Sequence, residues 1–112
     1  FHSSLLAPAA ERLAEYMDKL RFGAPRIPMV NNVDVAVVDD PQQIKQALAR
    51  QARSPVRWVE VIRWMASAGV TDLVECGPGK VLSALTRRIE PTLTSHVITD
   101  PQSLTQTLEA LT

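Results

Sequence analysis

The stretch that decides the fold is Val70 to Ile89, which reads VTDLVECGPGKVLSALTRRI. Its first part is apolar and predicts a buried strand, which must end at Gly77 because Pro78 has no N–H to donate to a sheet. The apolar residues of its last part share one helical face: Val81, Leu82, Leu85 and Ile89. A strand that enters a helix through a glycine-rich turn is the repeating unit of α/β proteins with a parallel sheet. We therefore expect an α/β fold, with any functional site near this turn.

The turn itself, Gly77-Pro78-Gly79-Lys80, invites comparison with phosphate-binding loops, because a helix N-terminus presents free N–H groups and a lysine adds positive charge. A P-loop, however, needs a glycine five residues before its last glycine and a Ser or Thr directly after the lysine. This sequence has Val74 and Val81 at those positions. The sequence therefore predicts a tight turn and not a phosphate site.

The length and composition of the chain limit its class. Its 112 residues suffice for one domain with a core, but they are few for an α/β enzyme with a complete site. The 12 basic and 12 acidic residues cancel, which argues against wholesale binding to nucleic acid or membrane. A single cysteine excludes an internal disulfide, and no apolar run approaches the roughly 20 residues of a membrane span. These features favour a cytoplasmic protein, and the start at Phe1 instead of Met suggests part of a longer one.

The remaining sequence predicts helices separated by short extended segments. A first helical pattern begins at Ser3 or Ser4, either of which could cap it, and stops at Gly23. Three segments follow: a short strand at 27–30, a turn at Asn31-Asn32, and a loop or edge strand at 33–38.

Later helices begin where a capping side chain precedes proline, which suits the first helical position. These starts are Asp40-Pro41, Ser54-Pro55 and Asp100-Pro101, with another strand expected at 96–99. We expect the order α, β, α, α, β, α, β, α in one layered unit, with helices covering a parallel sheet.

Few residues are candidates for chemistry. His96 opens a short strand, where a surface or edge histidine is the ordinary interpretation, and Cys76 is expected to be a small core residue instead of a nucleophile. His2 lies in a serine-rich loop ahead of a helix, an exposed position from which an imidazole could act as a general base. The pattern alone does not separate this role from that of a loop histidine without function. No metal-ligand spacing occurs in the sequence.

Four blocks of the sequence, in order, resemble landmarks of the bacterial malonyl-CoA:acyl carrier protein transacylase family. They are 1–10 (FHSSLLAPAA), 28–34 (PMVNNVD), 50–58 (RQARSPVRW) and 75–82 (ECGPGKVL). The resemblance covers essentially the whole chain and points to the C-terminal part of that family's catalytic domain. It implies that residues 1–112 form the latter part of an α/β-hydrolase-like large subdomain of the acyl transferase fold, with short parallel strands covered by helices.

The resemblance also implies site residues. In that family a serine in a Gly-His-Ser-Leu-Gly elbow takes the malonyl group from malonyl-CoA and passes it to the phosphopantetheine thiol of acyl carrier protein, with a histidine as its base. His2 matches that histidine, and Gln51 matches the residue whose backbone carbonyl orients the ring. Phe1 matches a residue implied to favour malonyl over methylmalonyl groups, because its ring would fill the space of a 2-methyl group. No cofactor or metal is implied, since malonyl-CoA is a substrate.

Several parts of that enzyme have no counterpart in this sequence. They are the serine elbow, the arginine that pairs with the malonyl carboxylate, the upstream oxyanion-hole glutamine and the inserted ferredoxin-like subdomain. We therefore expect the chain alone to be inactive, and to need the N-terminal part of the same enzyme as a partner besides malonyl-CoA and acyl carrier protein.

Alternative interpretations stay open at this point. One is an acyltransferase of a polyketide synthase or a malonate decarboxylase system, and another is a non-catalytic binding module of the same fold. Basic residues could contact the acidic carrier protein, although a solvated helical surface explains them equally well: Arg53, Arg57, Lys80, Arg87 and Arg88.

Overall fold

The computed structural model describes residues 1–112 and divides into two units, Phe1–Val61 and Ile62–Thr112. Each unit has a two-stranded sheet of its own, whereas the sequence predicted one layered unit around a single parallel sheet. The boundary falls within helix α3 (Trp58–Ser67), where Val61 and Ile62 are almost completely buried. None of the helices combines the length and the apolar composition needed to span a lipid bilayer.

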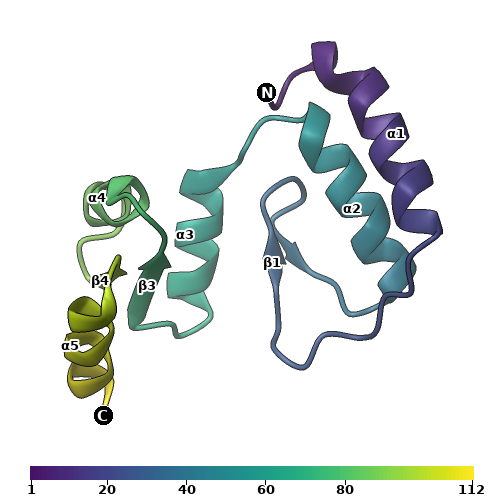
Figure 1. Cartoon of the computed structure of the whole chain (residues 1–112). Helices are drawn as coiled ribbons and strands as arrows, with labels where there is room; N and C mark the ends of the chain where they lie inside the picture. Colours follow the sequence, from purple (N-terminus) through teal and green to yellow (C-terminus); the bar gives the residue numbers. More distant parts are fainter. The chain divides into compact units, whose positions relative to one another are not determined.

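The first unit is built on a pair of helices. Its elements are η1 (Ser4–Leu6), α1 (Ala7–Asp18), β1 (Val30–Asn31), β2 (Ala36–Val37) and α2 (Pro41–Arg53). Figure 1 shows α1 and α2 side by side and running in opposite directions, so that the start of α1 lies beside the end of α2. The buried apolar residues of these two helices are Ala10, Met17, Ile44 and Ala47. This packing brings the segment ahead of η1 to the last turn of α2.

The strands of the first unit form a small antiparallel hairpin. Val30 pairs with Val37 and Asn31 pairs with Ala36, so residues 32–35 form the turn. The sequence analysis placed Asn31 in a turn, which is wrong, because its backbone lies in β1. The expected loop or edge strand at 33–38 is confirmed, because residues 33–35 lie in the turn and β2 is one strand of a two-stranded hairpin.

The second unit contains the predicted strand–turn–helix. Its elements are β3 (Asp72–Cys76), α4 (Val81–Ile89), β4 (Thr94–Ile98) and α5 (Pro101–Leu111). β3 and β4 are parallel, with a register from Asp72 opposite Thr94 to Cys76 opposite Ile98. α4 contacts both strands and α5 packs against β4, as Figure 1 shows. The expected fold class, short parallel strands with helices, is therefore confirmed.

The predicted helix starts at Asp40-Pro41 and Asp100-Pro101 are confirmed, whereas the start at Ser54-Pro55 and the serine cap of the first helix are wrong. The carboxylates of Asp40 and Asp100 accept hydrogen bonds from the backbone N–H groups of Gln43 and Ser103, and each is followed by proline in the first turn. Ser54 instead terminates α2, and α3 begins at Trp58. Neither Ser3 nor Ser4 caps through its side chain, because the chain enters α1 through the 3-10 turn η1.

The second unit leaves much of its apolar surface exposed. Cys76, expected in the core, is exposed where β3 ends and enters the turn, and Leu73 and Val74 are only half-buried. Large apolar side chains of α4 and α5 are exposed as well: Val81, Leu82, Leu85, Leu104, Leu108 and Leu111. The described residues thus do not cover these two helices completely.

Candidate active site

His2 is held at the C-terminal end of α2. Its backbone N–H donates to the carbonyl of Ala52 at 3.2 Å, and its ring Nδ1 lies 2.9 Å from the carbonyl oxygen of Gln51. The last carbonyls of an α-helix have no partner within the helix, so they are free to accept from an incoming donor. The structure therefore brings His2 and Gln51 together through the backbone oxygen that the resemblance implied, while their catalytic roles stay predictions.

This contact selects one form of the imidazole. A carbonyl oxygen can only accept a hydrogen bond, so the Nδ1 atom that faces Gln51 must carry the proton in the neutral ring. The lone pair then lies on Nε2. Because the His2 side chain is exposed, Nε2 is accessible, and the neutral ring has the tautomer that a general base requires.

The last turn of α2, which receives this ring, carries charges of its own. Aligned peptide dipoles leave partial negative charge at a helix C-terminus, which stabilises a nearby cation by about 0.3–1 kcal/mol. The last turn carries Arg50 and Arg53, whose positive charges oppose this effect. Asp34 offsets the first of them, because its two oxygens lie 2.6 and 2.8 Å from the Arg50 guanidinium.

The backbone of His2 is in an unusual conformation. His2 and Val35 both have φ of 55°, and they are the non-glycine residues of the chain with positive φ. Such conformations are more costly for β-branched residues than for histidine, and they persist where surrounding contacts enforce them. For His2 the two hydrogen bonds to the end of α2 provide that constraint.

Phe1, the predicted selectivity residue, is fully exposed beside His2. Its ring therefore packs against none of the described residues. A role in selectivity needs a substrate or another protein segment against this ring, and it stays a prediction.

The turn after β3 is closed to anions by the chain itself. The Glu75 carboxylate accepts from the backbone N–H of Leu82 at 3.2 Å and of Ser83 at 2.8 Å. These N–H groups belong to the first turn of α4, where a bound phosphate would otherwise sit. The sequence analysis rejected a phosphate site because the motif failed, and the structure adds a physical reason.

The remaining titratable candidates form local contacts. His96 is 14% exposed in its side chain, and its Nε2 lies 2.9 Å from Asp72 Oδ1, so it is a paired and mostly buried histidine instead of a surface one. The hydrogen bond from His96 lowers the pKa of Asp72, and a second one from Thr71 acts in the same direction. No group of three or more His, Cys, Asp or Glu side chains could hold a metal ion.

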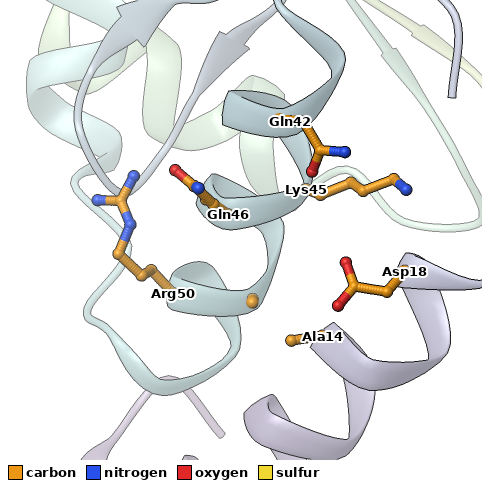
Figure 2. A pocket seen from close by; sticks show the side chains of 7 residues that line it. Ala14, Asp18, Gln42, Lys45, Gln46 and Arg50 are labelled. Carbon is orange, nitrogen blue, oxygen red and sulfur yellow. The ribbon is translucent and has the colours of Figure 1, made fainter.

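A surface pocket of about 420 Å³ lies between α1 and α2. Figure 2 shows its two cationic side chains, Lys45 and Arg50, leaving α2 on opposite sides. Lys45 donates to the carbonyl of Leu20 at 2.8 Å and lies 5.2 Å from the centre of the Phe22 ring, while Arg50 is engaged by Asp34. Because both cations already have partners, we assign no ligand to this pocket.

The chain is similar to known proteins along nearly its whole length. The malonyl CoA-acyl carrier protein transacylase of Escherichia coli K12 is 44% identical over 108 residues, which are 96% of this chain and 35% of that protein. The corresponding protein of Bacillus subtilis 168 is 37% identical over 111 residues, 99% of this chain and 35% of that protein. This chain matches the C-terminal part of malonyl CoA-acyl carrier protein transacylases. It thus spans about 35% of the length of the curated transacylases that it matches.

Solved transacylase structures have the same backbone arrangement. An acyl-carrier-protein S-malonyltransferase from Burkholderia pseudomallei 1710b superposes with a TM-score of 0.93 at 54% identity, covering 97% of this chain and 36% of that one. A malonyl-transacylase in complex with a type II polyketide synthase acyl carrier protein superposes with a TM-score of 0.93 at 43% identity, covering 97% and 35%. No family model matches the chain.

The sequence analysis missed two contacts of this chain. Asp34 and Arg50 lie 16 residues apart, and no local rule pairs a turn residue with a residue at the far end of the next helix. Glu75 was treated only as part of a buried strand, although an acidic residue shortly before an uncapped helix N-terminus is a usable signal for a long-range cap.

Proposed function

We propose that this chain supplies the general base of a malonyl-CoA:acyl carrier protein transacylase. The enzyme would transfer the malonyl group from malonyl-CoA to the phosphopantetheine thiol of acyl carrier protein through a malonyl-serine intermediate. The observation that carries the proposal is the Nδ1 contact of His2 with the Gln51 carbonyl, in a chain that matches transacylases over nearly all its length.

The proposed first half-reaction uses the free Nε2 of His2. The serine hydroxyl, expected on the N-terminal part that the relatives carry, gives its proton to Nε2 while its oxygen attacks the thioester carbonyl carbon. The tetrahedral intermediate then collapses, the carbon–sulfur bond breaks, and the proton passes from Nε2 to the coenzyme A sulfur. Malonyl-serine and free coenzyme A are formed, and the imidazole returns to its neutral form.

The second half-reaction repeats these steps with a different thiol. The phosphopantetheine thiol of the carrier protein gives its proton to Nε2 and attacks the ester carbonyl carbon. The carbon–oxygen bond breaks and the serine oxygen takes the proton back, so no proton is gained or lost overall. In both halves the Gln51 carbonyl would keep Nδ1 protonated, and the negative end of α2 would stabilise the transient imidazolium.

The proposed substrates and location follow from this chemistry. Hydroxyl and imidazole groups suffice for acyl transfer, so we propose no cofactor or metal, and malonyl-CoA serves as a substrate. Both substrates are water-soluble, which fits a cytoplasmic enzyme of fatty-acid synthesis. In this proposal residues 1–112 are the C-terminal portion of the catalytic domain, with the nucleophile elbow and the ferredoxin-like subdomain in the N-terminal part.

The proposal also includes a contact surface for the acyl carrier protein. Among the basic residues considered, Arg57 is already paired with Glu60, whereas the other four are exposed and form no ion pair. Arg53 lies alone at the end of α2, and Lys80, Arg87 and Arg88 lie together around α4. Unpaired cations are free to meet the acidic surface of a carrier protein, and such contacts mainly raise the rate of association. We therefore propose these three residues as the docking contact.

The test uses the complete enzyme, meaning residues 1–112 joined to the N-terminal part that the relatives carry. His2→Ala should lower the rate of malonyl transfer by about 10²- to 10⁴-fold, the usual effect of losing a general base. Gln51→Ala should cost far less, because the contact uses the backbone oxygen. The matched control is His96→Gln, which changes the other histidine of the chain and should transfer at nearly the parent rate.

The outcomes separate the competing functions. Transfer by the His2→Ala enzyme at the parent rate would remove His2 as the base. If intact mass measurement finds no malonyl adduct on the parent protein after treatment with malonyl-CoA, the non-catalytic binding module becomes the better interpretation. An equally severe loss in Gln51→Ala would mean that the amide side chain takes part.

A further inference from the structure

The hairpin tip opposite the end of α2 is rigidly built. Asn31 is 5% exposed, and its amide group donates to the Ala36 carbonyl at 3.1 Å while its Oδ1 accepts from the Asp34 N–H at 2.7 Å. One short side chain thus ties the two ends of the four-residue turn. Val35, beside Asp34, is held at a positive φ that valine rarely adopts. These contacts fix the position of the Asp34 carboxylate relative to β1 and β2.

The Asp34 carboxylate pairs with Arg50 of α2, which directly precedes Gln51, the residue whose carbonyl holds His2. Both oxygens of Asp34 are engaged by Arg50, at 2.6 Å to Nη1 and 2.8 Å to Nη2. An Arg–carboxylate pair with two parallel hydrogen bonds fixes orientation as well as distance. Since Arg50 is adjacent to Gln51 in the same helical turn, the pair anchors the helix end whose carbonyls accept from His2.

We propose that Asp34 and Arg50 are positioning residues for His2, a proposal that rests on the general-base function above. Neither residue touches the imidazole in the hydrogen bonds of the structure. Their ion pair sets the place of the last turn of α2, and through it the direction of the Gln51 carbonyl. The path runs from Asn31 through Asp34, Arg50 and Gln51 to His2, within the first unit.

The negative charge of Asp34 is a second way in which this residue would assist proton transfer to His2. If Asp34 were neutral, the Arg50 guanidinium would keep an uncompensated positive charge in the turn that receives the imidazolium. Like charges raise the free energy of that state, so the proton transfer to Nε2 would become less favourable. Asp34→Asn should therefore slow the chemical step through both position and charge, whereas Arg50→Gln, which removes the positive charge, should slow it through position alone; neither change should affect substrate binding much.

The experiment replaces Asp34→Asn and Arg50→Gln, singly and together, in the complete enzyme. The readout is malonyl transfer to free pantetheine, which avoids any effect on carrier-protein docking. We expect kcat to fall by about 3- to 30-fold in each single variant, the size of indirect coupling between residues, with KM for malonyl-CoA unchanged. The double variant should fall no further than the singles, because both remove the same contact. Arg50→Lys, which keeps the charge without the fork, should lie between the parent and Arg50→Gln.

The matched control is Glu60→Gln. Glu60 forms an equally short two-bond pair with Arg57, at 2.6 and 2.7 Å, and Arg57 also reaches the Val33 carbonyl of the hairpin turn at 3.4 Å. This pair therefore shares the surroundings of Asp34, but it holds no carbonyl of α2. Its loss should leave kcat at the parent value. An equal fall in Glu60→Gln and Asp34→Asn would overturn the proposal, and so would an unchanged kcat in Asp34→Asn or losses that multiply in the double variant.

A spectroscopic readout keeps the test independent of activity. The ¹⁵N resonances of the His2 ring report which nitrogen is protonated, and the parent should have the proton on Nδ1. Asp34→Asn should lower the population of this tautomer, whereas Glu60→Gln should not. If His2→Ala transfers normally, the general-base function fails while these resonances still decide whether the ion pair positions the ring. An unchanged tautomer in Asp34→Asn would refute the positioning role.

Discussion

The carboxylate of Glu75 should stabilise the start of α4 from outside the helix. The N-cap residue of α4 is Lys80, which makes no capping hydrogen bond with its side chain. Glu75 replaces that cap by accepting from two N–H groups, those of Leu82 and Ser83. Glu75→Gln removes the charge and leaves one oxygen to accept where two did so before.

The expected cost follows from these contacts. Loss of a hydrogen bond to a charged group costs roughly 1.5–3 kcal/mol, and loss of a negative charge at a helix N-terminus roughly 0.3–1 kcal/mol. Because the remaining amide oxygen recovers part of this, we expect a local loss of about 2 kcal/mol. That corresponds to about 30-fold faster amide exchange, since each 1.36 kcal/mol is a factor of ten.

The assay is hydrogen exchange of the Leu82 and Ser83 amides in the complete enzyme, which reports local opening without a global unfolding transition. The matched control is Glu90→Gln at the other end of α4, where a negative charge opposes the helix dipole instead of complementing it. Glu90→Gln should not accelerate exchange at these two amides. Unchanged exchange in Glu75→Gln, or an equal effect of both variants, would refute the capping argument.

Three further predictions concern selectivity, acid and the isolated chain. Phe1→Ser in the complete enzyme should narrow the preference for malonyl over methylmalonyl groups, and an unchanged ratio of the kcat/KM values would remove Phe1 from selectivity. Hydrogen bonds from Arg50 lower the pKa of Asp34 below its ordinary value of 3.8, so this pair stabilises the fold above pH 3.8 and loses its effect as the pH falls through the lowered pKa. Acid unfolding should therefore begin at higher pH in Asp34→Asn, and an unchanged midpoint would contradict this. Residues 1–112 alone should transfer no malonyl and should aggregate through the exposed faces of α4 and α5; a monodisperse monomer with a cooperative melt would contradict that expectation.

Sequence patterns predicted the elements best where local chemistry decides the backbone. Pro78 ends β3 by lacking an N–H, and Asp40 and Asp100 each cap a helix that begins with proline, so these boundaries needed no tertiary information. Ser54-Pro55 carries a similar signal and failed, because Ser54 lies at the end of α2 and the chain stays extended until Trp58. The motif alone does not tell a helix start from the end of the preceding helix.

The candidate site was predictable in part. The resemblance supplied His2 and Gln51, and the structure places them within hydrogen-bond distance. Nothing local in the sequence indicated that Asn31 would brace a hairpin tip or that Asp34 would reach Arg50. Those contacts depend on how the hairpin packs beside α2, which a pattern of apolar residues does not specify.

The use of a peptide oxygen to hold His2 has a consequence for how this region can vary. Every residue type carries a backbone carbonyl, so side-chain changes at position 51 leave the oxygen in place. Acid does not protonate this oxygen as it would protonate the carboxylate of an aspartate. Changes in helix length act differently, because each residue added to or removed from α2 turns its end by about 100°. We therefore expect substitutions at position 51 to be tolerated, and insertions or deletions within α2 to be excluded.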